Sequence, residues 1–343
     1  MGRLRRILGR ASVGPGDVDA AMRRALLRSL VQDWDGVEAE LTRVAQADSG
    51  RSDVYLALAR LYRLRGEIGR AIRVHQNQLL RRDLSGAERL EALRGLAGDF
   101  RKGGFLQRAI AAYEELLSQR PEDVEALRAL VRLHADARDH DRAIELAKKL
   151  ARVERRDSRP EEARLLVERA EAAHAEGRTE DARKALKRAL RRAPESARAW
   201  LLLGTLETEL GRSKGALAAW QRVPELESRG GPEIYSRIES GFAALGKPLQ
   251  FEEYLHARLE KHPEDGPARL ALAGALAARG ETTAALTEAR RVVERDPDDL
   301  LAHRSLARIL LAEGREQEAL KVFEGLLDAL ERRGLLASRE RIE

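Results

Sequence analysis

The feature that most constrains the fold is a repeat of about 34 residues that runs through most of the chain. A small or apolar residue recurs eight times, and the successive intervals are 38, 34, 39, 34, 35, 34 and 34 residues. The eight positions are Ala71, Ala109, Ala143, Ala182, Ala216, Phe251, Ala285 and Ala319. A period of this length is typical of helix–turn–helix repeats that stack into a solenoid.

Three further positions come into register when these residues are counted as position 20 of each repeat. Position 8 is small at Ala59, Ala97, Val131, Ala170, Gly204, Ala273 and Ala307, and Glu239 is the exception. Position 15 is glycine at Gly66, Gly104, Gly177, Gly211, Gly246, Gly280 and Gly314, and Arg138 breaks that run. Position 32 is proline at Pro121, Pro194, Pro263 and Pro297.

Each of these positions has a physical reason in a pair of packed helices. Small residues let two helices approach closely, glycine ends the first helix in a left-handed conformation, and proline stops the second helix. Large residues at positions 4, 7, 11 and 24 fill the space between helices: Tyr55, Trp200, Tyr235, Phe100, Phe242, Tyr113, Trp220 and Phe323. The pattern resembles the tetratricopeptide repeat. It implies an all-α solenoid, a right-handed superhelix of about nine helix–turn–helix repeats, and it disfavours a generic helical bundle.

The repeat also predicts the domain organisation. Residues 1–17 form a basic N-terminal tail that we expect to be flexible, and residues 18–343 form the solenoid. A first repeat covers Val18 to Gln46, and a capping helix runs from about Arg315 to Leu330 with a polar outer face. The 39-residue interval contains residues 155–160, where we expect a longer connection at which the solenoid could bend.

Composition excludes several function classes. The chain has no cysteine, so disulfides and thiolate metal sites are absent. No apolar run approaches the roughly 18 residues that span a bilayer, and no signal peptide is evident, so we expect a soluble cytoplasmic protein. In the tail, Arg3, Arg5, Arg6 and Arg10 alternate with Leu4, Ile7 and Leu8. This segment is either a disordered basic tail or a short peripheral anchor on anionic lipid at the inner membrane.

The motifs of common enzymes are also missing. There is no phosphate-binding G-x-x-x-x-G-K-[ST] loop and no G-x-S-x-G nucleophile elbow. The seven histidines are scattered at His75, His134, His140, His174, His256, His262 and His303, and we interpret them as surface or packing residues. We therefore predict no catalytic residues, no cofactor and no metal site.

Basic charge is concentrated in one zone of the chain. Residues 51–120 carry 14 basic and 8 acidic side chains, which is an excess of +6 and equals the net charge of the whole chain. In tetratricopeptide repeats, positions 2, 5, 9, 12 and 13 of each first helix face the concave groove. Those positions hold the candidate partner-binding residues Arg60, Arg63, Arg94, Arg101, Lys102, Arg128 and Arg132, with acidic neighbours at Asp53, Glu91, Glu125 and Asp136.

The later repeats have a smoother and more apolar set at the groove positions. It comprises Leu201, Thr205, Thr208, Ala243, Ala244, Leu270, Gly274, Ala277, Ala278, Leu301 and Leu311. A protein partner, a peptide or helix with an acidic part and an apolar part, would complement such a groove. The alternative is that the arginines only keep an exposed face soluble.

Two other ligands are disfavoured. Nucleic acid is a rival because the isoelectric point is about 9.7. However, the aromatic residues occupy core positions and leave few rings for base stacking, so no nucleic acid is expected. The clamp that binds chaperone C-termini uses lysine and asparagine at groove positions, and the single asparagine, Asn77, lies on a second helix.

One stretch resembles a narrower family. Repeat two reads Leu64-Arg65-Gly66-Glu67 and then Ala71-Ile72-Arg73-Val74-His75-Gln76, and four extra residues precede a segment with Asp99-Phe100 and Gly104. This stretch resembles the lipopolysaccharide assembly protein B family. The resemblance is good over about residues 20–150, and over the rest of the chain the number of repeats agrees. The resemblance implies an adaptor that promotes turnover of the lipid A deacetylase by a membrane-bound AAA+ protease. Members have an N-terminal membrane helix and a four-cysteine rubredoxin-like domain, which this sequence lacks.

Three hypotheses follow from the sequence. The first is a non-enzymatic adaptor in lipopolysaccharide homeostasis, with a protease and a lipid A biosynthesis enzyme as its partners. The second is a general scaffold with the same fold for an unrelated complex. The third, an enzyme, is the least favoured because no catalytic constellation is present.

Overall fold

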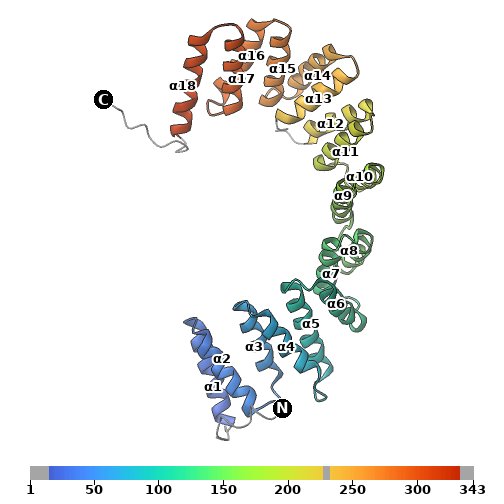
Figure 1. Ribbon diagram of the computed structural model, residues 1–343, viewed down its shortest axis with the longest axis vertical. Coiled ribbons are helices and arrows are strands. Elements are labelled where there is room, and N and C mark those ends of the chain that lie inside the picture. Colours follow the sequence, from blue (N-terminus) through green and yellow to red (C-terminus); the bar gives the residue numbers. More distant parts are fainter. Residues whose placement is uncertain (1–14, 227–231, 333–343) are drawn as a thin grey trace, which may run out of the picture. The chain divides into compact units, whose positions relative to one another are not determined.

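The computed structural model describes residues 15–226 and 232–332. Over these ranges the backbone forms eighteen α-helices and no strand (Figure 1). They are α1 (Pro15–Leu30), α2 (Trp34–Ala47), α3 (Ser52–Leu64), α4 (Ile68–Leu79), α5 (Gly86–Lys102), α6 (Leu106–Gln119), α7 (Val124–Asp136), α8 (His140–Glu154), α9 (Arg159–Ala175), α10 (Thr179–Arg192), α11 (Ala197–Glu209), α12 (Ser213–Leu226), α13 (Pro232–Ala244), α14 (Pro248–Lys261), α15 (Gly266–Ala278), α16 (Thr282–Arg295), α17 (Leu300–Ala312) and α18 (Glu316–Arg332). Eighteen helices make nine pairs, so the expected all-α repeat solenoid is confirmed.

The chain divides into two compact units. The N-terminal unit ends at residue 168 and the C-terminal unit starts at residue 169, so the boundary falls inside α9. Within each unit, helices pack chiefly against their neighbours in sequence, as α3 does with α4, and α15 with α16 (Figure 1). This nearest-neighbour packing is what a solenoid requires, because no single repeat can bury its apolar face alone.

The small residues of the repeat lie where helices cross. All eight residues at position 20 are at most 2% exposed, and the six at position 8 that carry a side chain, Glu239 apart, are at most 3% exposed. Gly204 shows how tight the crossing is, because a Cβ built there would lie 2.2 Å from Nε1 of the buried Trp220. Glu239, the exception in the sequence, is exposed.

Glycine ends the first helix of most repeats. The seven glycines at position 15 have φ between 69° and 83°, a region in which a Cβ clashes with the backbone. Arg138 occupies the same position with φ 61° and is one of three non-glycine residues with positive φ in the described chain. Glycine is therefore common at position 15 because the backbone there is left-handed. Arg138 adopts the same left-handed conformation although it is not glycine.

Short polar side chains start many of the helices. A carboxylate or hydroxyl oxygen accepts a hydrogen bond from a backbone N–H of the first turn at Asp33, Ser85, Asp123, Asp139, Ser196, Asp265 and Asp299. Such caps satisfy N–H groups that have no partner inside the helix. The position-32 prolines lie in the connections that follow α6, α10, α14 and α16, as expected.

The two long intervals of the repeat arise because two helices are about one turn longer than the others. Helices α5 and α9 have 17 residues, whereas α3, α7, α11, α13, α15 and α17 have 13. The connection between α8 and α9 spans residues 155–158 and is as short as the connection between α6 and α7, residues 120–123. The expected longer connection at residues 155–160 is therefore wrong, because the added residues continue a helix.

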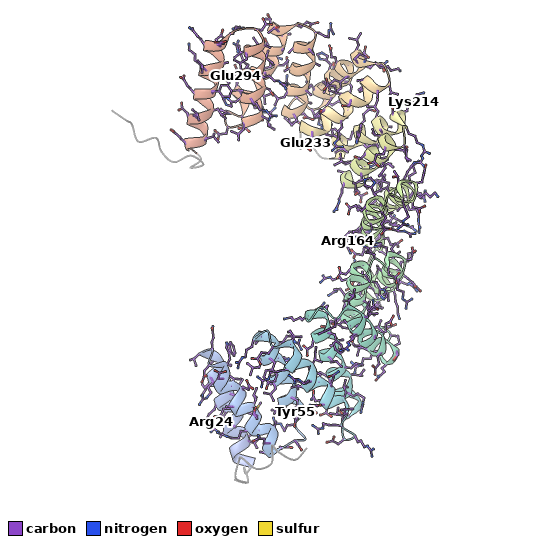
Figure 2. The ribbon with its side chains drawn as sticks, viewed as in Figure 1. Arg24, Tyr55, Arg164, Lys214, Glu233 and Glu294 are labelled. Atoms are coloured by element: carbon purple, nitrogen blue, oxygen red, sulfur yellow. The ribbon has the colours of Figure 1, made fainter. Side chains whose placement is uncertain are left out.

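The ends of the solenoid differ slightly from expectation. Helix α1 begins at Pro15, three residues before the predicted start, and the last helix ends at Arg332. The proposed tail and anchor within residues 1–14 lie outside the described residues, as do residues 333–343. None of the described helices has the length and apolar character needed to cross a bilayer. Charged side chains such as Lys214 on α12 and Glu294 on α16 are exposed on the surface (Figure 2).

The helix crossing at Gly204 can be tested by an opposed pair of alanine substitutions. Gly204→Ala should lower the free energy of unfolding by about 1–3 kcal/mol, because its Cβ would overlap the buried Trp220 ring. Gly274→Ala should instead raise it by about 0.5–1 kcal/mol, because its Cβ meets nothing within 4 Å and alanine favours a helix. Urea unfolding followed by circular dichroism measures both, and equal changes would show that the register at Gly204 is wrong. The larger substitution Gly204→Trp should be more destabilising still.

Candidate partner-binding site

A pocket of about 320 Å³ lies in the N-terminal unit, between residues of α3, α4, α5, α6 and α7. Its twelve lining residues are Leu56, Arg60, Arg63, His75, Glu91, Arg94, Gly95, Gly98, Arg101, Lys102, Tyr113 and Glu125. Five of them are basic and two are acidic, so the lining carries an excess of positive charge. Five of the seven predicted groove residues line this one pocket, and Arg128 and Arg132 do not.

Two glycines of α5 leave room for the pocket. A Cβ on Gly95 would lie 2.3 Å from Nε2 of His75, so only glycine allows the imidazole to lie against α5. A Cβ on Gly98 would have no close contact, and its nearest atoms, Nη1 of Arg63 and the Tyr113 hydroxyl, would both be 3.9 Å away. The backbone at Gly98 therefore forms part of the pocket wall without filling it.

A buried carboxylate holds two lining residues in place. Asp99 is fully buried, and its Oδ2 lies 2.8 Å from Nδ1 of His75, which is 1% exposed. Its Oδ1 lies 2.6 Å from Nε of Arg63, an ion pair by distance without the alignment of a hydrogen bond. A buried charge needs such compensation, because an unpaired carboxylate away from water is strongly unfavourable. Asp99 thus orients both Arg63 and His75.

Two more of the predicted groove arginines, besides Arg63, are bound to carboxylates. Arg94 contacts Asp123, whose other oxygen accepts from the Ala126 N–H and so caps α7. Burial alone would raise the pKa of the Asp123 carboxyl. The Ala126 N–H and the Arg94 guanidinium outweigh burial and hold that pKa below its ordinary value. Arg128 contacts Glu154, and Arg156 and Arg128 together lower the pKa of Glu154. These two guanidinium groups stabilise the fold and are only partly available to a ligand.

The other cations of the site are free of such partners. Arg60, Arg101 and Lys102 are exposed and make no hydrogen bond or ion pair with any described residue. Arg132 is likewise exposed and forms no ion pair within the described chain, although it lies outside the pocket. Of the expected acidic neighbours, Asp53 is engaged by Arg51 at 2.6 Å. The uncompensated positive charge at the pocket therefore comes from Arg60, Arg101 and Lys102.

The groove positions of the C-terminal unit are less apolar than expected. Leu270 is buried, whereas Leu311 is 49% exposed. Arg304 and Arg308 occupy groove positions 5 and 9 of the last repeat, and both are exposed. The contrast between the early and late repeats therefore rests on the pocket more than on the overall distribution of charge.

Sequence reasoning missed the His75–Asp99 pair and the role of Tyr113. Their signal was present, because His75 and Asp99 both lie in the stretch that resembles the narrower family. His75 is a packing residue, as expected, but it also lines the pocket. No group of three or more His, Cys, Asp or Glu side chains that could hold a metal ion occurs among residues 15–226 and 232–332.

Comparison with known proteins places the chain in a family. One family model described as tetratricopeptide repeat matches residues 94–160, 147–193, 167–226, 243–299 and 270–332, and a second model with the same description matches residues 54–88. Lipopolysaccharide assembly protein B of Escherichia coli (strain K12) is 27% identical over 282 residues, which are 82% of this chain and 72% of that protein. The protein of the same name from Haemophilus influenzae is 29% identical over 268 residues, 77% of this chain and 67% of that protein. The alignment with a crystal structure of MamA protein covers 52% of this chain and 94% of the MamA chain, with 24% identity and a TM-score of 0.35. The chain belongs to the tetratricopeptide repeat family and resembles lipopolysaccharide assembly protein B.

Proposed function

We propose that the protein is a non-enzymatic adaptor that binds an acidic segment of a partner protein at the basic pocket of its N-terminal unit. Tetratricopeptide repeats are typically protein-interaction scaffolds without catalytic activity, and the repeat match covers most of this chain. The observation that carries the proposal is the clustering around one pocket of Arg60, Arg101 and Lys102, three cations that have no carboxylate partner among the described residues.

The electrostatics of this cluster favour binding over solubilisation. Many surface arginines in the described ranges have a carboxylate within 4.0 Å, for example Arg142 with Glu145 and Arg222 with Glu225. Arg101 and Lys102 are adjacent in sequence and repel each other without such compensation. An anionic partner relieves that repulsion, raises the association rate and makes binding sensitive to salt.

We further propose that the client belongs to lipopolysaccharide biosynthesis and that the protein presents it to a protease. Support comes from the resemblance to lipopolysaccharide assembly protein B across 82% of the chain. In this proposal the protein acts in the cytoplasm, at most peripheral at the inner membrane through its basic N-terminal residues. A general scaffold for an unrelated complex would use the same pocket with a different partner.

Affinity purification of the tagged chain from its bacterial host separates these two candidates. A lipopolysaccharide adaptor should retain a protease and a lipid A biosynthesis enzyme, and it should lose them when the pocket charges are reversed. Recovery of neither protein by the unaltered chain would contradict the lipopolysaccharide role. Retention of another complex in a pocket-dependent manner would support the general scaffold.

Charge reversal tests the pocket directly. The double variant Arg60→Glu, Arg101→Glu should bind an acidic peptide about tenfold more weakly or worse, because two attractive charges become repulsive. The probe is a fluorescein-labelled, C-terminally amidated peptide with glutamates at one end and leucine and alanine at the other, followed by fluorescence anisotropy. Affinity of the unaltered protein should fall as salt is raised.

The matched control reverses two exposed arginines at groove positions of the C-terminal unit. The double variant Arg304→Glu, Arg308→Glu makes the same change in net charge and should bind the peptide nearly as well as the unaltered protein. Thermal unfolding followed by circular dichroism should be similar for both variants, since none of the four residues has an ion-pair partner in the described chain. Equal weakening by the two variants would contradict a pocket-specific role.

Arg94 is left out of the reversed set, and its structural role gives a separate prediction. Arg94→Gln should lower the free energy of unfolding by about 1–2 kcal/mol, between the values for exposed and buried ion pairs. Arg101→Gln should change it by no more than about 0.5 kcal/mol. The folded pKa of Asp123 is below its ordinary value of 3.8, so this stabilisation is complete above pH 3.8 and is lost as the pH falls through the folded pKa. Urea unfolding at a series of pH values should therefore show the Arg94→Gln deficit shrinking in acid, and a constant deficit would contradict the pairing.

A further inference from the structure

One wall of the pocket carries hydrogen-bond donors that no described residue of the protein uses. The Tyr113 side chain as a whole is 2% exposed, and its hydroxyl makes no hydrogen bond with any described residue. The hydroxyl is not among the polar atoms that are sealed from solvent without a partner, so it is open to the pocket that it lines. A ligand that takes the place of water in the pocket can therefore accept a hydrogen bond from this hydroxyl.

A cationic donor lies near the same point. Nη1 of Arg63 and the Tyr113 hydroxyl are each 3.9 Å from the Cβ position of Gly98, which is empty because residue 98 is glycine. Asp99 contacts Arg63 at Nε, and the terminal nitrogens of the guanidinium make no hydrogen bond with a described residue. The guanidinium is thus held at one edge and open at another.

We propose that this pocket seats one carboxylate of the partner, the side chain of a single glutamate or aspartate, against Arg63 and Tyr113 over Gly98. The inference rests on the proposed function and names the group that the pocket recognises. The carboxylate accepts from the Arg63 guanidinium and from the Tyr113 hydroxyl, and Arg60, Arg101 and Lys102 surround it with further positive charge.

The chemistry of the wall selects a carboxylate. A guanidinium offers planar, paired N–H donors that match a carboxylate. Burial raises the pKa of the Tyr113 hydroxyl, so the group remains a protonated donor at neutral pH. Glu91 and Glu125 also line the pocket, and they disfavour a more highly charged anion. Because Asp99 and His75 fix Arg63 before the ligand arrives, little side-chain freedom remains to be lost on binding.

This arrangement differs from the lysine and asparagine clamp that the sequence argues against. Here the recognition group is one arginine fixed by a buried aspartate, together with a tyrosine from the second helix of the next repeat. The basic groove positions continue beyond the pocket on α7, at Arg128 and Arg132. A partner segment that also reaches these residues extends past the pocket, which favours a side chain over a chain terminus as the source of the carboxylate.

Two variants disrupt the proposed carboxylate-binding position at Arg63, Tyr113 and Gly98 without removing a cation. Tyr113→Phe deletes only the unpartnered hydroxyl, so it should leave the thermal unfolding unchanged or slightly improved. Gly98→Gln fills the empty space with an uncharged side chain, and its Cβ has room. Gly274→Gln is the matched control, because Gly274 occupies the same repeat position in the C-terminal unit and its Cβ meets nothing within 4 Å.

The test combines these variants with single substitutions in the labelled, amidated acidic peptide. Each glutamate of the peptide is replaced in turn by glutamine, and affinity is measured by fluorescence anisotropy at fixed salt. With the unaltered protein, one position should cost about tenfold in affinity and the other positions much less. Tyr113→Phe and Gly98→Gln should each weaken the unsubstituted peptide several-fold, and both should become insensitive to the substitution at that one position. Gly274→Gln should behave like the unaltered protein.

Other outcomes separate this inference from the function on which it rests. If all glutamates contribute equally and the effects of protein and peptide substitutions simply add, no carboxylate is seated and the inference fails. The proposed function would still stand if Arg60→Glu, Arg101→Glu weakened binding. If the unaltered protein does not bind the peptide at any salt concentration, the proposed function fails as well. Binding that appears only with a free C-terminal carboxylate would overturn the assignment to a side chain.

Discussion

The close crossing of helices at small side chains is the contact on which the rest of the structure depends. Where alanine or glycine lies at positions 8 and 20, two helices pack closely, and these small residues are buried at the crossing. The side chains at groove-facing positions are then not needed in the core, so they can be charged. At α5 the same need for closeness recurs with a different partner, because His75 lies against Gly95. The pocket follows from this contact, since it brings a buried histidine and its aspartate beside the groove.

Each unit contains a buried aspartate, and the two are used differently. Asp265 in the C-terminal unit accepts from the Tyr235 hydroxyl at 2.6 Å and from Nε of Arg258 at 2.9 Å, and it caps α15. These three contacts of Asp265 serve the fold, although Nη2 of Arg258 is buried without a hydrogen-bond partner in the described chain. Asp99 in the N-terminal unit contacts Arg63 and His75, and the nearby Tyr113 hydroxyl makes no hydrogen bond with a described residue. A network that lies wholly inside a repeat interface stabilises that interface, whereas one beside a donor that is open to a pocket is suited to a ligand.

Much of the fold was predictable from residues that act locally. Glycine at position 15, proline at position 32 and small residues at positions 8 and 20 each reflect one backbone angle or one crossing, so a single sequence reveals them. The ion pair between Arg94 and Asp123 joins residues 29 apart, and no local pattern shows that this arginine is occupied. The long interval before α9 was misread for a related reason, because Arg155 to Pro160 contains turn-forming residues although α9 already begins at Arg159. The free Tyr113 hydroxyl required the structure, because an aromatic residue at position 24 is expected to be core.

The two halves of the proposed site act on different steps of binding. Exposed cations such as Arg60 and Lys102 attract an acidic segment over distances comparable to the Debye length, about 8 Å at physiological salt, so they govern the association rate. A carboxylate held by Arg63 and Tyr113 in a pocket of about 320 Å³ makes short-range contacts that must break before release, so it governs the lifetime of the complex. Raising the salt concentration should therefore slow association far more than it hastens release. Surface arginines that merely kept the protein soluble would have no reason to separate these two rates.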